Sequence, residues 1–191
     1  MNAKTSNTQM VNLPIEYSDK QVTPFGGMSL LKRFLDKVEV KDYLQSLSLP
    51  EPGSNRGFDP SSIVQSFWLG IWTGTSRYIH CDWLRYDKVL QDIFGLEKFC
   101  MQNFEATEAS FRFIMVAYNF ISLFRHFALQ KHSKATLNTI KSQCFALGSW
   151  TSNHANRKVL KIALPVKKRM WMDGLFSQIA VLKSPFSYSN A

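Results

Sequence analysis

Hydrophobic residues recur at helical spacing along most of the chain, and loops rich in proline and glycine interrupt the pattern. Apolar positions three and four residues apart predict a helix over about 28–38 and a shorter one over about 40–48. The segment LPEPGSNRG (49–57) predicts an exposed loop, because proline and glycine both interrupt helices. The first part of the chain is therefore expected to fold as two helical units on either side of this loop.

Two further helical segments follow the loop. The Asp59 carboxylate can accept backbone N–H groups and Pro60 suits the first helical position, so we predict a helix from there to near Gly74. Residues 76–94 present one apolar face, and Gly95 can take the left-handed conformation that ends a helix. This pattern fits either one bent helix or two short ones.

The next segment is the most apolar of the chain. Thr107 can cap a long helix over about 108–130, in which large hydrophobic side chains cover most of the circumference. A helix of this kind belongs inside a larger structure than 191 residues comfortably supply. We therefore expect some of its rings to lack cover, with Phe113, Phe120 and Phe127 as the candidates.

The last third of the chain mixes helix and strand patterns. Residues 135–144 are compatible with a helix, and 145–150 and 158–164 read as short strands around a turn at 153–156. Residues 165–179 predict a final basic amphipathic helix. The expected fold class is mainly α, with a short C-terminal β-hairpin.

Composition excludes several classes of protein. With 45 % apolar and 19 % charged residues the chain is not disordered. Its longest uncharged apolar stretch, 113–124, is well short of the roughly 18–20 residues that span a bilayer, and the first twenty residues lack a secretory apolar run. We expect a cytoplasmic protein in which Cys81, Cys100 and Cys144 are reduced, buried thiols.

The positive charge is concentrated in the C-terminal part. Residues 1–110 contain 11 Lys and Arg against 13 Asp and Glu, whereas residues 111–191 contain 12 Lys and Arg and a single acid, Asp173. This asymmetry favours a polyanionic partner, since each neutralised phosphate releases condensed counterions. Nucleic acid is the first choice, and an acidic membrane surface or the ribosome are the alternatives.

Two groups of cations interleaved with aromatic residues are candidate DNA-binding elements. The first group follows the predicted third helix, and the second lies in the hairpin and at the start of the last helix. A solvated charged face explains the same pattern about as well, although three cations in a first helical turn oppose the helix dipole unless an anion binds there. The candidate residues are Arg77, Arg85, Lys88, Arg157, Lys158, Lys161, Lys167, Lys168, Arg169 and Trp171.

Sequence support for enzymatic chemistry is weak. The chain has no P-loop, no G-x-G-x-x-G, no G-x-S-x-G and no H-E-x-x-H motif. His80, Cys81 and Asp82 are adjacent potential ligands, but neighbours on a helix point in different directions and no second pair has zinc-site spacing. We expect no metal site and no resident cofactor in this chain.

Several segments resemble a known family. The amino-terminal stretches are VTPFGGMSLLKRF (22–34), LPEPGSNRG (49–57), FWLGIW (67–72) and HCDWLRYDKVL (80–90). They resemble the amino-terminal region of DDE transposases of bacterial insertion sequences. The stretches LEKFCMQNFEATEASFRF (96–113), CFALG (144–148) and WMDGLFSQ (171–178), together with Asn119, resemble the carboxyl-terminal region of the same proteins.

The resemblance implies that the middle of the family's protein is absent. Intact members are more than twice as long, and their RNase H-like core uses three acidic residues to hold two divalent metal ions such as Mg²⁺. Here the two matched regions meet near Gly95 and Leu96, as an internal deletion would leave them. The family's Tyr-x₂-Arg-x₃-Glu-x₆-Lys signature is also missing, because Val89 and Ile121 occupy the third position after the two candidate tyrosines. No catalytic residue is therefore assigned.

The expected organisation is a flexible arm (1–22), a transposase-like N-terminal helical region (23–95) and a basic C-terminal region (96–191). The expected function is that of a truncated transposase without strand-transfer activity that still binds double-stranded DNA at the element's ends, in the nucleoid and away from membranes. The alternatives are a regulator that competes for DNA or pairs with an intact transposase or with itself, and a pseudogene product without function.

Overall fold

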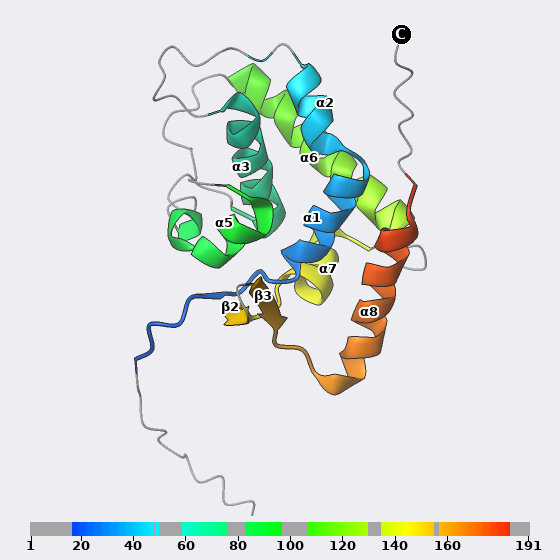
Figure 1. Ribbon diagram of the computed structural model, residues 1–191. Helices are drawn as coiled ribbons and strands as arrows, with labels where there is room; N and C mark the ends of the chain where they lie inside the picture. Colours follow the sequence, from blue (N-terminus) through cyan, green and yellow to red (C-terminus); the bar gives the residue numbers. More distant parts are fainter. Residues whose placement is uncertain are drawn as a thin grey trace, which may run out of the picture.

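The computed structural model describes residues 17–47, 49, 59–75, 83–96, 107–129, 135–154 and 157–183, with the backbone alone described for 107–112 and His154. These ranges form a mainly helical structure with a small three-stranded antiparallel sheet of order β1-β2-β3 (Figure 1). The predicted fold class is confirmed. Most of the proposed flexible arm lies outside the described residues.

Helices α1 (Met28–Lys37) and α2 (Val40–Ser46) occupy the first two predicted positions. The apolar stripe of α1 is its buried face, and Leu31 and Phe34 are fully buried. Glu39 joins the two helices with a positive φ of 54°, so the chain turns sharply between them.

Helix α3 (Pro60–Thr73) begins and ends where the sequence predicts. The Asp59 carboxylate accepts the Ser62 amide N–H at 2.9 Å, and Gly74 ends the helix with a φ of 85°. The left-handed conformation at this position is accessible to glycine at little cost, which explains why the helix ends there.

The segment after α3 contains two short helical pieces in its described part, not one bent helix. A helical turn over 83–86 is followed by α5 (Lys88–Phe94). Asp87 separates them because its carboxylate caps α5, accepting the Leu90 amide N–H at 2.9 Å. Gly95 ends α5 with a φ of 65°, as predicted.

Helix α6 (Thr107–Phe127) is long and partly wrapped by its neighbours. The expectation that Phe120 lacks cover is wrong, because its ring is only 7 % exposed and lies 5.1 Å from the Trp68 ring. Phe113 and Phe127 are partly buried against the core. Among the described side chains of α6, the large apolar ones that are exposed are instead Met115 and Tyr118.

The C-terminal part contains the predicted hairpin with shifted boundaries. Helix α7 (Leu137–Ile140) continues into a π-helical turn, η2 (Lys141–Phe145), and the hairpin consists of β2 (Ser149–His154) and β3 (Arg157–Ile162). The predicted strand start at Phe145 is wrong, because Phe145 is the last residue of η2. Its side chain is fully buried, and its ring centroid lies 5.6 Å from that of Phe124. The last helix, α8 (Val166–Val181), is confirmed.

A two-residue strand, β1 (Val22–Thr23), completes the sheet by pairing with β2. The expected organisation placed Val22 in the arm and Thr23 in the N-terminal helical region, because two residues are too few to show a strand period. The junction after β1 is held by the Gly26 amide, which donates to the Leu147 carbonyl at 2.8 Å.

The parts of the chain before and after Gly95 share one hydrophobic core. Helix α3 packs against α6, α1 packs against α8 and η2, and buried residues of all these elements form a single cluster. Figure 1 shows the sheet beside the start of α1, with α8 leading away from β3. Among the described helices, none combines the length and the apolar character that crossing a bilayer requires.

Candidate nucleic-acid interface

The two faces of the three-stranded sheet differ in chemistry. In the antiparallel register Val22 lies opposite Trp150, and Trp150 lies opposite Lys161, so these side chains share one face. On the other face Thr23 and Ser149 are buried. The face with Trp150 is therefore the outer face.

Cations surround the tryptophan on this outer face. Lys161 and Arg157 are exposed on β3, and neighbouring Val159 is 41 % exposed. The Lys20 ammonium lies over the Trp150 ring, 4.1 Å from its centroid. No described strand residue on this face is acidic. We call Lys20, Trp150, Arg157 and Lys161 the sheet patch.

A second cationic group lies at the start of α8. Lys167, Lys168 and Arg169 are all exposed, and the first turn contains no acidic residue. The N-cap residue is Pro165, whose side chain cannot accept a hydrogen bond from the first amides. Three cations thus lie at the positive end of a helix dipole, an arrangement that a bound anion would stabilise. We call these three cations the helix patch.

The two patches are consecutive along the chain. The Ala163 amide donates to the Gly148 carbonyl at 2.8 Å, which extends the hairpin to within three residues of α8. The Arg169 Nε donates to the Leu164 carbonyl at 3.1 Å and so ties the first turn of α8 to the incoming loop. A short ordered connection therefore joins the sheet patch to the helix patch.

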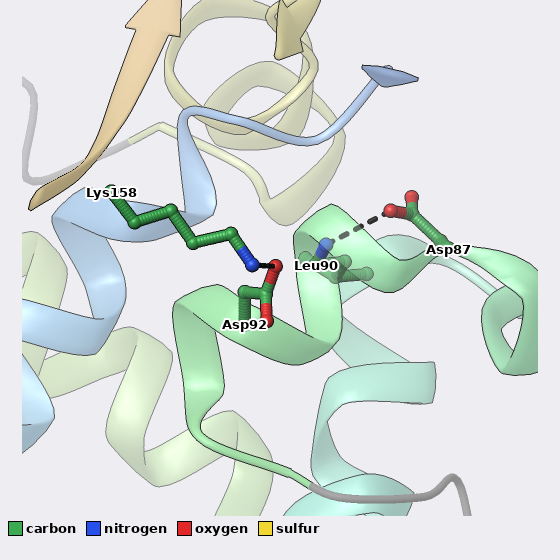
Figure 2. Close-up of polar contacts among 4 residues, drawn as sticks. All are labelled: Asp87, Leu90, Asp92 and Lys158. Atoms are coloured by element: carbon green, nitrogen blue, oxygen red, sulfur yellow. Dashed lines mark hydrogen bonds and ion pairs between the residues drawn. The ribbon is translucent and has the colours of Figure 1, made fainter. Parts of the chain in front are cut away.

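Lys158 points away from the sheet patch. It belongs to the opposite face of β3 and forms an ion pair with Asp92 of α5 (Figure 2). A cation with an adjacent carboxylate attracts phosphate less strongly, because the two charges largely cancel at a distance. Of the predicted hairpin cations, Arg157 and Lys161 thus remain the stronger candidates.

The remaining predicted residues lie in other surroundings. Arg85 and Lys88 are exposed near Trp83 and Tyr86, which are 69 % and 84 % exposed. Trp171 packs against the hydrophobic core and is only partly exposed. Arg77 lies outside the described residues, as does the His80-Cys81-Asp82 sequence.

Sequence reasoning missed Lys20 and Trp150. The alternation of the hairpin could have placed Trp150 on the same side as Ser152, but only the pairing of β1 with β2 brings Lys20 to the ring. A contact between such distant segments leaves no local pattern in the sequence.

The described acidic residues near the core have structural partners. Burial raises the pKa of Asp87, although hydrogen bonds from the Thr23 hydroxyl and the Leu90 amide oppose that effect. Hydrogen bonding from the Ser61 hydroxyl is the main cause that lowers the pKa of Asp59. Within the described ranges, no three His, Cys, Asp or Glu residues come together as a metal site would require.

Cys144 is a buried free thiol, as expected, whereas Cys81 and Cys100 lie outside the described residues. Burial raises the pKa of the Cys144 thiol to about 12, and the nearby Lys168 charge opposes this only in part. A thiol with so high a pKa is protonated at neutral pH and is a poor nucleophile.

Comparisons of the chain with protein-family models, with curated proteins and with solved structures find no match.

Proposed function

We propose that this chain is a DNA-binding remnant of an insertion-sequence transposase, which binds DNA phosphates through the sheet patch and the helix patch and does not cleave the DNA. The observation that supports this most strongly is the helix patch, with three exposed cations at an uncapped helix start and no acid in the turn. The transposase descent rests on the sequence resemblance described above.

Phosphate is the anion that fits this arrangement best. Lys167, Lys168 and Arg169 can each neutralise a phosphate, and the positive end of the α8 dipole attracts the same anion. The sheet patch supplies Lys20, Arg157 and Lys161. If all six cations contact phosphates, log Kd changes with log salt with a slope of about 5.

The binding experiment compares two matched pairs of lysines. Fluorescence anisotropy of a labelled duplex is measured at several salt concentrations with wild type, with Lys167→Ala/Lys168→Ala, and with Lys37→Ala/Lys41→Ala. The control removes the same charge from exposed positions at the α1–α2 corner, beside acidic Asp36 and Asp42.

We expect the helix-patch variant to bind about tenfold or more weakly and to lose about two units of salt slope, because two phosphate contacts disappear. The control should bind within about twofold of wild type, because its lysines lie in a mixed-charge region. Equal losses in both variants, or a wild-type affinity independent of salt, would contradict the proposal.

The absence of cleavage is proposed on chemical grounds. Strand transfer by two metal ions needs carboxylates that converge on ions about 3.5–4 Å apart. Asp87 caps a helix and Asp92 is paired with Lys158, so these two described acids have other roles. We expect no nicked product from a duplex incubated with the protein and Mg²⁺ or Mn²⁺. Metal-dependent cleavage that one carboxylate substitution abolishes would overturn this part.

Binding without cleavage would make the chain a competitor for the ends of related elements. This regulatory role follows from the same surface and needs no further contact. Adding the protein to a transposition assay with an intact relative should lower the yield, and Lys167→Ala/Lys168→Ala should restore it.

A further inference from the structure

The outer face of the sheet has features that a duplex-binding surface does not need. β2 is the central strand, so Trp150 lies in the middle of the face, with Val22 on one side and Lys161 on the other. Val22 is 64 % exposed and Val159, two pairs further along the hairpin on the same face, is 41 % exposed. The centre of this face is therefore apolar and aromatic, and its margin is cationic.

Trp150 cannot stack on a base that is paired within a duplex. The faces of paired bases are covered by their neighbours along the helix, and a ring on a sheet can reach only unpaired bases. Surfaces that bind single strands combine aromatic platforms for the bases with cations that follow the backbone. The sheet patch has this combination, and its described strand residues carry no negative charge to repel the backbone.

The position of Lys20 is compatible with such a ligand. Its ammonium covers the Trp150 ring in the free protein, and it belongs to the exposed segment 17–21, which has no regular secondary structure. A cation–π contact at an exposed site is weaker than base–aromatic stacking. An incoming base can therefore displace the ammonium, which then lies close to the backbone phosphate of the same strand.

We propose that the sheet patch binds single-stranded DNA, with an unpaired base stacked on Trp150 and the backbone phosphates bound by Lys20, Arg157 and Lys161. This inference rests on the proposed function, since it takes the sheet patch as part of the DNA-binding surface, and it deepens it by assigning the two patches different ligands. The helix patch binds duplex, and the sheet patch binds the unpaired strand.

The experiment measures anisotropy with two labelled probes, a thymidine oligonucleotide of about 12 nucleotides, within the usual site sizes of single-strand binders, and a blunt duplex of the same length. The variants are Trp150→Ala, Trp150→Phe and, as a control, Tyr43→Ala, which removes an aromatic ring that is 42 % exposed on α2, a helix that contributes no candidate DNA-binding residue. Thermal unfolding of each variant shows whether it remains folded.

We expect Trp150→Ala to weaken single-strand binding about tenfold and duplex binding by less than twofold, while Trp150→Phe retains most of the single-strand affinity because it keeps a ring. Tyr43→Ala should leave both affinities unchanged. If Trp150→Ala proves unfolded, single-strand binding by Trp150→Phe and Lys161→Gln tests the inference. The inference requires that Trp150→Phe preserve single-strand binding and that Lys161→Gln weaken it.

The outcomes separate the two proposals. Steep salt-dependent duplex binding with no single-strand binding, or with single-strand binding that does not depend on Trp150, overturns the inference and leaves the proposed function standing. Trp150-dependent single-strand binding without duplex binding supports the inference and overturns the proposed function. Equal losses for both probes in Trp150→Ala also overturn the inference, because they show a duplex contact.

Discussion

Trp72 donates its indole N–H to the Ala117 carbonyl at 3.1 Å, and the pair links the N-terminal part of the chain to the C-terminal part. One turn earlier Trp68 makes the same bond to the Phe113 carbonyl, also at 3.1 Å. The two bonds are four residues apart on both helices, so successive turns of α3 lie against successive turns of α6 along this contact. A buried indole N–H needs such an acceptor, and the α6 backbone provides it.

Replacing Trp72 by Phe should lower the free energy of unfolding by about 1–3 kcal/mol, since the substitution removes a buried hydrogen bond and part of a ring that is 1 % exposed. Denaturant unfolding measures the change. Trp83→Phe, on an exposed ring, should stay within about 0.5 kcal/mol of wild type. Similar effects of the two substitutions would show that the α3–α6 contact is not formed as described.

Gly27 lies where the chain passes directly over the backbone of η2, and a Cβ atom there would overlap the Cys144 carbonyl oxygen. Gly27→Ala should therefore destabilise the fold by more than about 2 kcal/mol, because backbone atoms of η2 would have to shift. Gly174 is the matched control, since nothing lies within 4 Å of a Cβ placed there on α8. Gly174→Ala should stabilise the helix by about 0.5–1 kcal/mol. Thermal unfolding of the two variants should shift in opposite directions.

The contribution of Asp87 to the free energy of unfolding should increase as the pH falls, which is the opposite of the usual behaviour of a carboxylate. Burial raises its pKa above the ordinary 3.8, so the folded state holds the proton more tightly than the unfolded chain. Its stabilising contribution is complete below the unfolded pKa and is lost as the pH rises through the folded pKa. Relative to Asp87→Asn, which keeps a capping oxygen, wild type should gain stability as the pH falls from about 7 toward about 4.

Asp59 is the control, because its contribution to stability should change with pH in the opposite direction. Its pKa is lowered, mainly by the Ser61 hydroxyl, so its contribution is present above the unfolded pKa and is lost as the pH falls through the folded pKa. Relative to Asp59→Asn, wild type should lose stability on acidification. Denaturant titrations at several pH values test both, and the same pH trend for the two aspartates would contradict the assignment.

Asp92→Asn should strengthen DNA binding roughly two- to fivefold at low salt, because it removes a negative charge and releases Lys158. The stability cost should be below about 1 kcal/mol, since both side chains of this ion pair are more than a third exposed to solvent. Duplex anisotropy measures the gain. Asp42→Asn, on an exposed position of α2, should leave the affinity unchanged, and an equal gain there would point to net charge alone.

Most of the local structure follows from residues that are close together in the chain. The ends of α3 and α5 follow from Asp59, Gly74, Asp87 and Gly95, because capping carboxylates and left-handed glycines act on their own few neighbours. Helical periodicity located the buried face of α1 for the same reason. The charge asymmetry that pointed to a polyanion is also a property of the sequence alone.

Which distant residues meet depends on how the helices and the sheet pack together. β1 is two residues long and exists because β2 pairs with it, and this pairing brings Lys20 over Trp150. The same packing turned Lys158 toward Asp92 and away from the outer face, and it covered Phe120 with Trp68. These contacts join segments far apart in the chain, and their geometry depends on how the helices pack. Local propensities can therefore predict the elements of this protein but not the two patches that form its candidate interface.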